Sequence, residues 1–424
     1  MKTGAAPARM EISNIYAEGG PKWDGMVSVK SLAVQISRAC VHIIQYIGED
    51  APAYRTAAAE LRVAYWDWAS NATLPEVVTL DTLAVNSPTG PKIIKNPFHS
   101  YQFQNFPFPI KYMDAGILST TNHTTRCPGA DGSDVVAAVN AGLVTSGFKS
   151  QVYNVFTAVQ VFQEMETARY QTSSFESPHN NVHNSIGCSN GTMYDLNWSA
   201  FDPIFMLHHA NLDRLIALWQ AIYPDSGIFK ITDFEGALYG TAAGNVSADT
   251  PLKPFYNQDG SFHTSNSVRN ISTFGYTYLE LQPNHADDTY VSPSDLSDFV
   301  RLKVNSLYSG EPVSYSKSRR FKSMRTSRSR HGPARKAWSV AISVDKAELP
   351  LPATVGCYFD GSLVGKMALL AIPATGVTHS TIPLDVALSA AGLDLASEDA
   401  VLQYLNRTLG FEVRELKNRE FYAS

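Results

Sequence analysis

Charge is scarce in this sequence, and neither sign dominates. Of the 424 residues only 17% are Asp, Glu, Lys or Arg, and the formal net charge at pH 7 is −5. Proteins that bind nucleic acid neutralise its phosphates with an excess of Lys and Arg. The small acidic balance therefore argues against a nucleic-acid partner.

Long hydrophobic runs and targeting segments are also lacking. No apolar run approaches 18 residues, so neither a transmembrane helix nor a membrane partner is expected. Residues 1–9 lack the apolar stretch of a signal peptide. This favours an intracellular, cytoplasmic location and leaves secretion open.

Cysteine is rare, and no two cysteines form a Cys-x-x-Cys pair. The four are Cys40, Cys127, Cys188 and Cys357. Such usage predicts reduced thiols in an intracellular protein. Seven Asn-x-Ser/Thr sequons argue the other way, but a chain rich in Ser and Thr yields several of these by chance.

The remaining composition is that of an ordinary globular protein, with 44% hydrophobic and 11% aromatic residues. We expect a mainly helical domain at 1–285, a helix (294–308) and a basic linker (317–336) within 286–336, and a β-rich domain at 337–424. Surface loops with short helices are expected at 85–150. In the last domain the pattern predicts strands at 338–344, 354–359 and 366–372, and helices at 384–391 and 398–409.

Histidine spacing is the strongest signal of chemistry in the chain. His179 and His183 are four residues apart, which places them on one face of a helix. A second helix should begin at Asp202-Pro203, carry His208 and His209, and end near the charged pair Asp213-Arg214. Three neutral imidazoles around an open position suit copper, zinc or iron, and the spacing alone does not name the metal.

The amino-acid sequence around these histidines resembles that of a known family. The segments 179–183 and 201–214 closely resemble the second copper site of the tyrosinase family, which includes catechol oxidases and hemocyanins. Residues 61–69 and 273–278 resemble further landmarks of fungal tyrosinases, and residues 337–424 resemble their carboxy-terminal shielding domain. The resemblance implies a mainly α fold, with a helical-bundle central domain and a small β-rich domain after it.

The resemblance also implies residue roles. His179, His183 and His209 would bind the second copper, and His208 would not. Adjacent helical residues point about 100° apart, so only one of that pair is expected to bind. Asn180 and Glu176 would hold a water that takes the proton of a phenol. The alternative for Glu176 is that a carboxylate is simply favoured at a helix N-terminus.

The first copper site of the family is incomplete in this sequence. Upstream of Trp66 the only histidine is His42, whereas the family uses three. The segment that should carry the other ligands is missing near Lys30–Ser31. His42 lies in an apolar helical stretch and is expected to be structural. Two coppers are usual in the family, and we expect one or none here.

By resemblance, the function is that of a tyrosinase or catechol oxidase. Such an enzyme uses O2 and copper to hydroxylate monophenols and to oxidise o-diphenols to o-quinones, as in melanin formation. The alternative is an inactive family member that binds one copper or none. A zinc hydrolase is disfavoured because Asn180 stands where Glu would be needed, and an oxygen carrier would need both coppers. Phe359 could enter the copper pocket, but a core position at a strand end fits it better.

Overall fold

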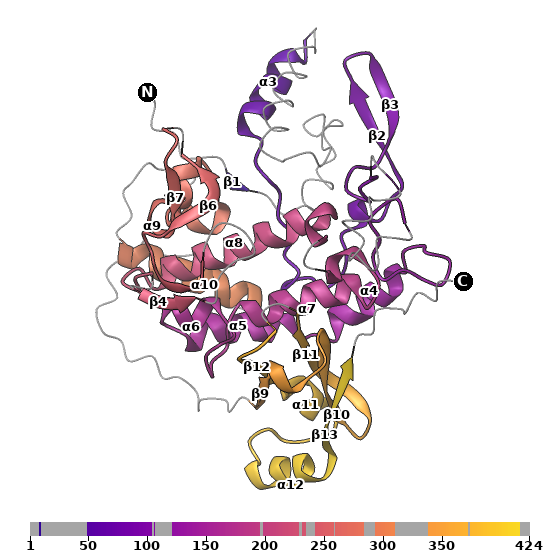
Figure 1. Ribbon diagram of the computed structural model, residues 1–424, viewed down its shortest axis with the longest axis vertical. Coiled ribbons are helices and arrows are strands. Elements are labelled where there is room, and N and C mark those ends of the chain that lie inside the picture. Colours follow the sequence, from indigo (N-terminus) through magenta and orange to yellow (C-terminus); the bar gives the residue numbers. More distant parts are fainter. Residues whose placement is uncertain are drawn as a thin grey trace, which may run out of the picture.

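Figure 1 shows the computed structural model of the chain. The structure describes residues 8–9, 49–103, 106, 121–195, 198–228, 231–234, 242–257, 259–283, 293–309, 338–371 and 374–415. His42 and the predicted basic linker at 317–336 lie outside the described residues.

Helices dominate the first part of the chain and strands the last. The α-helices are α3 (Ala51–Glu60), α4 (Val136–Val144), α5 (Phe148–Ala158), α6 (Phe162–Glu166), α7 (Glu176–Gly187), α8 (Ile204–Ile222), α9 (Ser265–Val268), α10 (Pro293–Tyr308), α11 (Asp385–Ala390) and α12 (Glu398–Thr408). The strands are β1 (Ala8–Arg9), β2 (Thr82–Ser87), β3 (Gly90–Lys95), β4 (Ile231–Phe234), β5 (Gly244–Ser247), β6 (Pro251–Tyr256), β7 (Phe262–Thr264), β8 (Thr277–Tyr278), β9 (Ser339–Asp345), β10 (Ala353–Phe359), β11 (Ser362–Leu369), β12 (Val377–Pro383) and β13 (Leu409–Glu415). Short 3-10 helices include η4 (Thr192–Tyr194) and η5 (Ser199–Phe201).

The larger hydrophobic core forms where α4, α5, α7, α8 and α10 pack together. α10 contacts both α5 and α8, and α4 contacts α7. The indole rings of Trp66, Trp68 and Trp219 are fully buried in this core. The two helices with paired histidines, α7 and α8, are therefore held by one continuous apolar interior.

The start of α8 is as predicted, but its end is not. The Asp202 carboxylate accepts a hydrogen bond from the Ile204 backbone N–H at 3.1 Å and so caps the helix. The helix continues to Ile222, which puts Arg214 in its interior rather than near an exposed end. Arg214 is 1% exposed, and it pairs with Asp67 and Glu280. Two carboxylates compensate the buried guanidinium, which the sequence pattern did not reveal.

The carboxy-terminal part has a second hydrophobic core between two small sheets. β10 pairs antiparallel with β11 and β13, and β9 pairs antiparallel with β12. The predicted strands and helices of this region are present, although β11 begins at Ser362, four residues before the predicted start. The predicted fold class, a helical-bundle domain with a small β-rich domain after it, is confirmed.

The second core docks directly beneath the helical one. β11 lies against α7 and β12 against α5 (Figure 1). α10, which the sequence grouped with the linker, packs its Val300, Val304 and Tyr308 side chains into the larger core. The domain boundaries at 285 and 336 stay a prediction. Residues 82–95, expected as part of a loop region, instead form the hairpin β2–β3.

The prediction of four reduced thiols is wrong for two of them. Cys127 and Cys188 form a disulfide, with their Cα atoms 4.9 Å apart. The loop before α4 packs against the end of α7, and this brings together two cysteines that are 61 residues apart in sequence. Cys357 is a buried free thiol, and Cys40 lies outside the described residues. The thiol argument for an intracellular location therefore no longer holds.

Among the helices in the described ranges, none combines the length and the hydropathy needed to cross a bilayer.

Candidate metal centre

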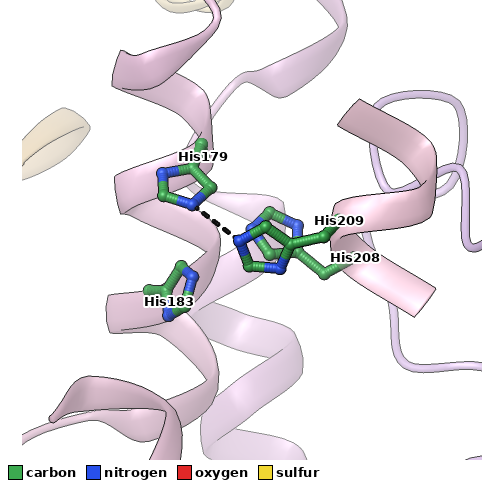
Figure 2. A group of neighbouring side chains, drawn as sticks. All are labelled: His179, His183, His208 and His209. Atoms are coloured by element: carbon green, nitrogen blue, oxygen red, sulfur yellow. Dashed lines mark hydrogen bonds between the residues drawn. The ribbon is translucent and has the colours of Figure 1, made fainter. Parts of the chain in front are cut away.

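Four histidines from two helices converge beside the larger core. His179 and His183 lie one turn apart on α7, and His208 and His209 project from α8 (Figure 2). One potential ligand atom from each of the four lies within 4.8 Å of the others. His183 and His208 are buried, whereas His179 and His209 are half-buried and form the accessible side of the cluster.

Three of these imidazoles are oriented by oxygen acceptors. The Nδ1 atom of His179 lies 2.8 Å from Asn180 Oδ1, that of His183 lies 2.8 Å from the Met193 carbonyl oxygen, and that of His209 lies 2.8 Å from the Phe205 carbonyl oxygen. Because an oxygen acceptor requires a proton on the nitrogen, each Nδ1 donates. The opposite nitrogen, Nε2, is then left with a lone pair, as in histidines that bind metals.

Burial keeps these imidazoles neutral. It lowers the pKa of His179 and of His209 to about 4, and the pKa of His183 lies well below its usual range for the same reason. The Nε2 atoms of His179 and His209 face each other at 3.2 Å (Figure 2). Two lone pairs at that distance repel each other unless a cation lies between them.

The same distance fits two ligands of one metal ion. Metal–nitrogen bonds of about 2.0–2.1 Å at a tetrahedral angle place two ligand nitrogens about 3.3 Å apart. Neutral imidazoles with second-shell acceptors on Nδ1 suit copper and zinc. The donor set and its geometry therefore fit a transition metal, which would also remove the repulsion between the two nitrogens.

The two residues predicted to hold a water lie next to this cluster. Glu176 and Asn180 are one turn apart on α7, so they share a face of that helix. Asn180 Oδ1 is engaged by His179, while the Glu176 carboxylate accepts from Thr167 Oγ1 at 2.8 Å and from the Ala168 N–H at 2.7 Å. Glu176 is also the first residue of α7, so the helix-terminus interpretation fits equally well.

Comparison with known proteins agrees with the histidine pattern. Residues 38–222 match the model of the common central domain of tyrosinase. That segment contains both histidine helices and all four clustered histidines.

The comparisons support a protein of the fungal tyrosinase family.

The relatives that the chain resembles include fungal tyrosinases and polyphenol oxidases. The chain is 31% identical over 272 residues to a tyrosinase of Neurospora crassa, covering 60% of this chain and 39% of that protein. It is 29% identical over 235 residues to polyphenol oxidase 2 of Agaricus bisporus, covering 53% and 42% respectively. The chain thus spans about two fifths of the length of these curated relatives. The fold matches the latent and active mushroom tyrosinase structure with a TM-score of 0.73 at 22% identity, over 90% of this chain and 73% of that one.

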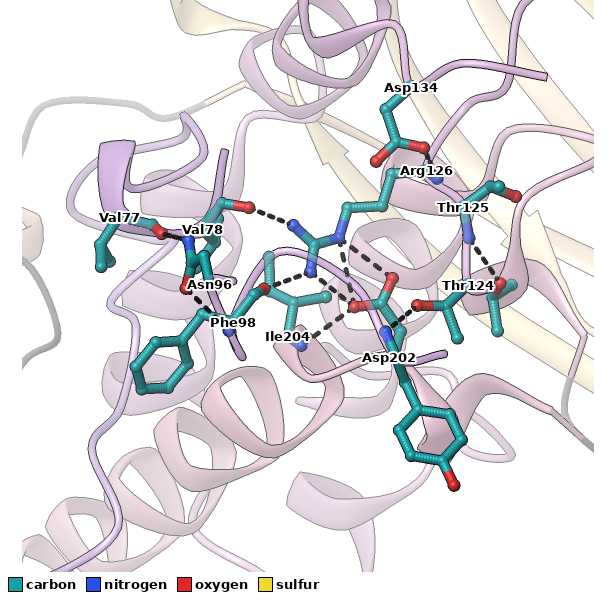
Figure 3. Close-up of polar contacts among 12 residues, drawn as sticks. Val77, Val78, Asn96, Phe98, Thr124, Thr125, Arg126, Asp134, Asp202 and Ile204 are labelled. Atoms are coloured by element: carbon teal, nitrogen blue, oxygen red, sulfur yellow. Dashed lines mark hydrogen bonds and ion pairs between the residues drawn. The ribbon is translucent and has the colours of Figure 1, made fainter. Parts of the chain in front are cut away.

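Buried polar contacts hold the loop before α8 in place in this tyrosinase-family domain. The Arg126 guanidinium donates to both carboxylate oxygens of Asp202 and to the carbonyl oxygens of Val78 and Phe98 (Figure 3). Asp202 is fully buried and also caps α8. The Arg126–Asp202 ion pair therefore helps to fix the start of α8, the helix that carries His209. The sequence alone did not point to Arg126.

A close backbone contact positions the acceptor for His183. A Cβ atom at Gly187 would lie 2.3 Å from the backbone nitrogen of Tyr194, so only glycine allows η4 to approach the end of α7 so closely. This approach brings the Met193 carbonyl oxygen to His183. Gly187 is visible in the sequence, but nothing there shows that the Met193 carbonyl oxygen is the hydrogen-bond partner of His183.

Phe359 does not enter the histidine cluster. It is the last residue of β10, 5% exposed, and it packs edge-on against Tyr404 in the second core at a ring separation of 5.6 Å. The interpretation of Phe359 as a core aromatic at a strand end agrees with this position.

Proposed function

We propose that this chain is a copper-dependent oxidoreductase of the tyrosinase type, in which His179, His183 and His209 bind copper and phenols are oxidised with O2. The proposal rests on one observation. The Nε2 atoms of His179 and His209 lie 3.2 Å apart and direct their lone pairs toward each other. When bound, copper supplies one-electron redox chemistry with O2, which imidazole ligands support.

The similarity to tyrosinases and polyphenol oxidases supports a phenol as the substrate class. The proposed reactions are hydroxylation of monophenols and oxidation of o-diphenols to o-quinones, in the formation of melanin-like pigment. A phenol would approach the half-buried side of the cluster, at His179 and His209. His183 is 1% exposed and would stay behind the metal.

Asn180 and Glu176 are proposed to act on the phenol proton. Asn180 fixes the His179 tautomer, and this contact also holds its side chain beside the site. The contacts of Glu176 with Thr167 and Ala168 fix its carboxylate one turn away on the same helix. A water held between the amide and the carboxylate would accept the proton as the phenol binds.

A second function has a specific observation in its favour. His42 is the only histidine upstream of Trp66, so the sequence offers no complete first triad. A chain with one copper would lack the metal pair of the family, and the alternative is an inactive member that binds one copper or none.

Both functions are tested on the whole chain reconstituted with Cu(II). The measurements are copper per chain and O2 consumption with an o-diphenol and a monophenol. Copper binding with saturable O2 consumption is the result we expect of the oxidase. One copper without O2 consumption would support the inactive alternative in its copper-binding form. A chain that binds no copper would overturn the proposed copper ligands and leave only an inactive member without metal.

A further inference from the structure

The Cys127–Cys188 disulfide lies close in the chain to the acceptor of a proposed copper ligand. It joins the loop before α4 to Cys188, the residue that follows α7. Met193, whose carbonyl oxygen lies 2.8 Å from His183 Nδ1, comes five residues after Cys188. The disulfide therefore anchors one end of the short loop that supplies this acceptor.

A second connection joins the same two segments at the other end of this loop. The Thr192 N–H donates to the Thr125 carbonyl oxygen at 2.8 Å, and the Thr125 N–H donates to Thr192 Oγ1 at 2.9 Å. Both threonines are buried. Residues 188–192 are thus attached to residues 125–127 by one covalent bond and by a pair of hydrogen bonds, and Met193 follows directly.

The two segments are also in close contact between these connections. A Cβ atom at Gly191 would lie 2.9 Å from the Thr125 carbonyl oxygen and 3.0 Å from the Cys127 backbone nitrogen. The Gly191 N–H donates to the Gly187 carbonyl oxygen at 2.6 Å. A displacement of residues 125–127 would therefore move Thr192 and, with it, the Met193 carbonyl oxygen.

The backbone of both cysteines is strained. The φ angle is 43° at Cys127 and 51° at Cys188, in the left-handed region that residues with a Cβ atom rarely adopt. Such conformations persist only where the surrounding structure holds them in place. Because the disulfide links these two residues to each other, its loss removes a restraint on both strained positions at once.

We propose that the Cys127–Cys188 disulfide positions His183, so that the copper affinity of this chain depends on the oxidation state of these two cysteines. The inference rests on the proposed copper site and extends it to the regulation of that site. With the disulfide intact, the Met193 carbonyl oxygen keeps the proton on Nδ1 of His183 and leaves the Nε2 lone pair for the metal. Without it, the loop relaxes, this tautomer is no longer enforced, and copper binds less tightly.

The reductant in this proposal is a dithiol, and Cys188 is the more accessible end of the bond. Cys188 is half-buried, whereas Cys127 is 4% exposed. A thiolate of the reductant attacks Cys188 Sγ, and Cys127 leaves as a thiolate that takes up a proton. The second thiol of the reductant then displaces Cys188 from the mixed disulfide. Two electrons and two protons thus pass to the cysteine pair, and the dithiol becomes a cyclic disulfide.

The rival explanation is that the disulfide only stabilises the fold. Its cysteines are 61 residues apart, and closing a long loop stabilises a protein by restricting the unfolded chain. A purely stabilising disulfide would raise the melting temperature and would change neither the His183 tautomer nor the copper affinity of the folded chain. The two explanations therefore differ in what happens at His183 while the protein remains folded.

The first measurement uses the apo protein and does not depend on copper. The full chain, labelled with nitrogen-15 in its histidines, is kept oxidised or is reduced with dithiothreitol. The imidazole nitrogen shifts of His183, assigned by their loss in His183→Phe, report which nitrogen carries the proton. We expect Nδ1–H in the oxidised form and a mixture of tautomers in the reduced form, at a temperature where circular dichroism shows both to be folded. An unchanged tautomer after reduction would overturn the inference.

The second measurement is Cu(II) titration of the double variant Cys127→Ser with Cys188→Ser, which avoids added thiols that bind the metal. Its affinity for Cu(II) should be at least about tenfold weaker than that of the wild type, as when a ligand histidine loses its hydrogen-bond partner. The double alanine variant replaces it if the serine variant does not fold. Cys357→Ser is the matched control, because Cys357 is a buried free thiol, and it should bind copper as the wild type does.

The outcomes separate this inference from the proposed function. If the wild type and the double variant bind copper equally tightly, the inference is overturned while the copper site stands. If the wild type binds no copper, the proposed function fails and the dependence of copper affinity fails with it, while the apo measurement still decides whether the disulfide positions His183. A lower melting temperature of the double variant with unchanged tautomer and affinity would support the rival explanation.

Discussion

Two opposite faces of α7 both carry polar side chains, but the groups that contact these side chains differ. On one face, His179 and His183 point toward the imidazoles of α8, and the Nε2 atom of His179 lies 3.2 Å from that of His209. On the opposite face, the Asn181 amide donates to the Lys366 carbonyl oxygen at 3.0 Å and accepts from the Ala368 N–H at 2.9 Å, both on β11. The first face carries the proposed metal site, whereas the polar side chains of the second pair with the carboxy-terminal domain.

The contrast shows how one helix can be buried without being apolar. Ser177, Asn181 and Ser185 lie on the domain-facing side and are all less than 9% exposed. Ser177 contacts the Ser380 hydroxyl at 2.6 Å, and Ser185 accepts from the Lys366 ammonium at 2.9 Å. The carboxy-terminal domain therefore supports α7 from the side opposite the histidines, through hydrogen bonds between the side chains of α7 and the backbone and side chains of β11 and β12.

The largest effect should come from the metal face. His183→Phe removes a proposed copper ligand while keeping an aromatic ring near Phe205, which lies 5.9 Å away. Copper per chain, measured by mass spectrometry, should fall to near zero at micromolar Cu(II). His123→Phe, which changes a histidine outside the cluster, should bind copper as the wild type does. Stoichiometric copper in His183→Phe would remove His183 from the ligand set.

The next effect concerns the docking face. Asn181→Ala leaves the Lys366 carbonyl oxygen and the Ala368 N–H of β11 without their partner, so the free energy of unfolding should fall by about 2–4 kcal/mol. Urea denaturation measures it, and Asn154→Ala on α5 is the control, because that side chain is half-exposed. Copper per chain should not change. A loss of copper equal to that of His183→Phe would mean that the two faces are not separable.

A smaller effect should appear in the pH dependence of docking. Burial lowers the pKa of Lys366 from 10.5 to about 8, so the charged form is disfavoured in the folded protein. Between pH 8 and 10.5 the unfolded chain binds the extra proton, and stability attributable to Lys366 rises with pH by up to about 1.4 kcal/mol per unit. Lys366→Met should lack this rise in urea denaturation curves. Parallel curves for both proteins across this range would refute the assignment.

The smallest effect should follow from Ser177→Ala. This variant removes the hydroxyl contact with Ser380 and keeps the packing, so the free energy of unfolding should fall by about 1 kcal/mol. Calorimetry of the whole chain would detect it. A loss as large as that of Asn181→Ala would show that the Ser177–Ser380 contact, rather than the amide pairing with β11, dominates the docking.

The sequence predicted the convergence of histidines on one face of α7 better than the docking of its opposite face, for a physical reason. Two histidines four residues apart on one helix, with an adjacent pair on a second helix, indicate a shared metal site from local spacing alone, without any knowledge of tertiary packing. The helix start at Asp202 was visible for the same reason, since capping is local. The choice between His208 and His209 was not visible, because it depends on which nitrogens find acceptors in three dimensions.

What the sequence could not predict depends on contacts between distant segments. Asparagine is a residue type usually found on the surface. Asn181 is nevertheless buried, and it pairs with Lys366 on β11, 185 residues further along the chain. Arg214 looked like a charged helix end and is instead buried with Asp67 and Glu280. Cys127 and Cys188 were expected to be free thiols, because nothing in the local sequence shows that the loop before α4 packs against the end of α7.

The central claim is that the histidine face of α7, with α8, binds one copper while the opposite face is occupied by protein. The most direct test is native mass spectrometry of the copper-reconstituted full chain, beside a variant in which His179, His183 and His209 are all changed to Phe. One copper in the wild type and none in the variant is the predicted result. A wild type with no copper or with two, or a variant that keeps its copper, would contradict the account.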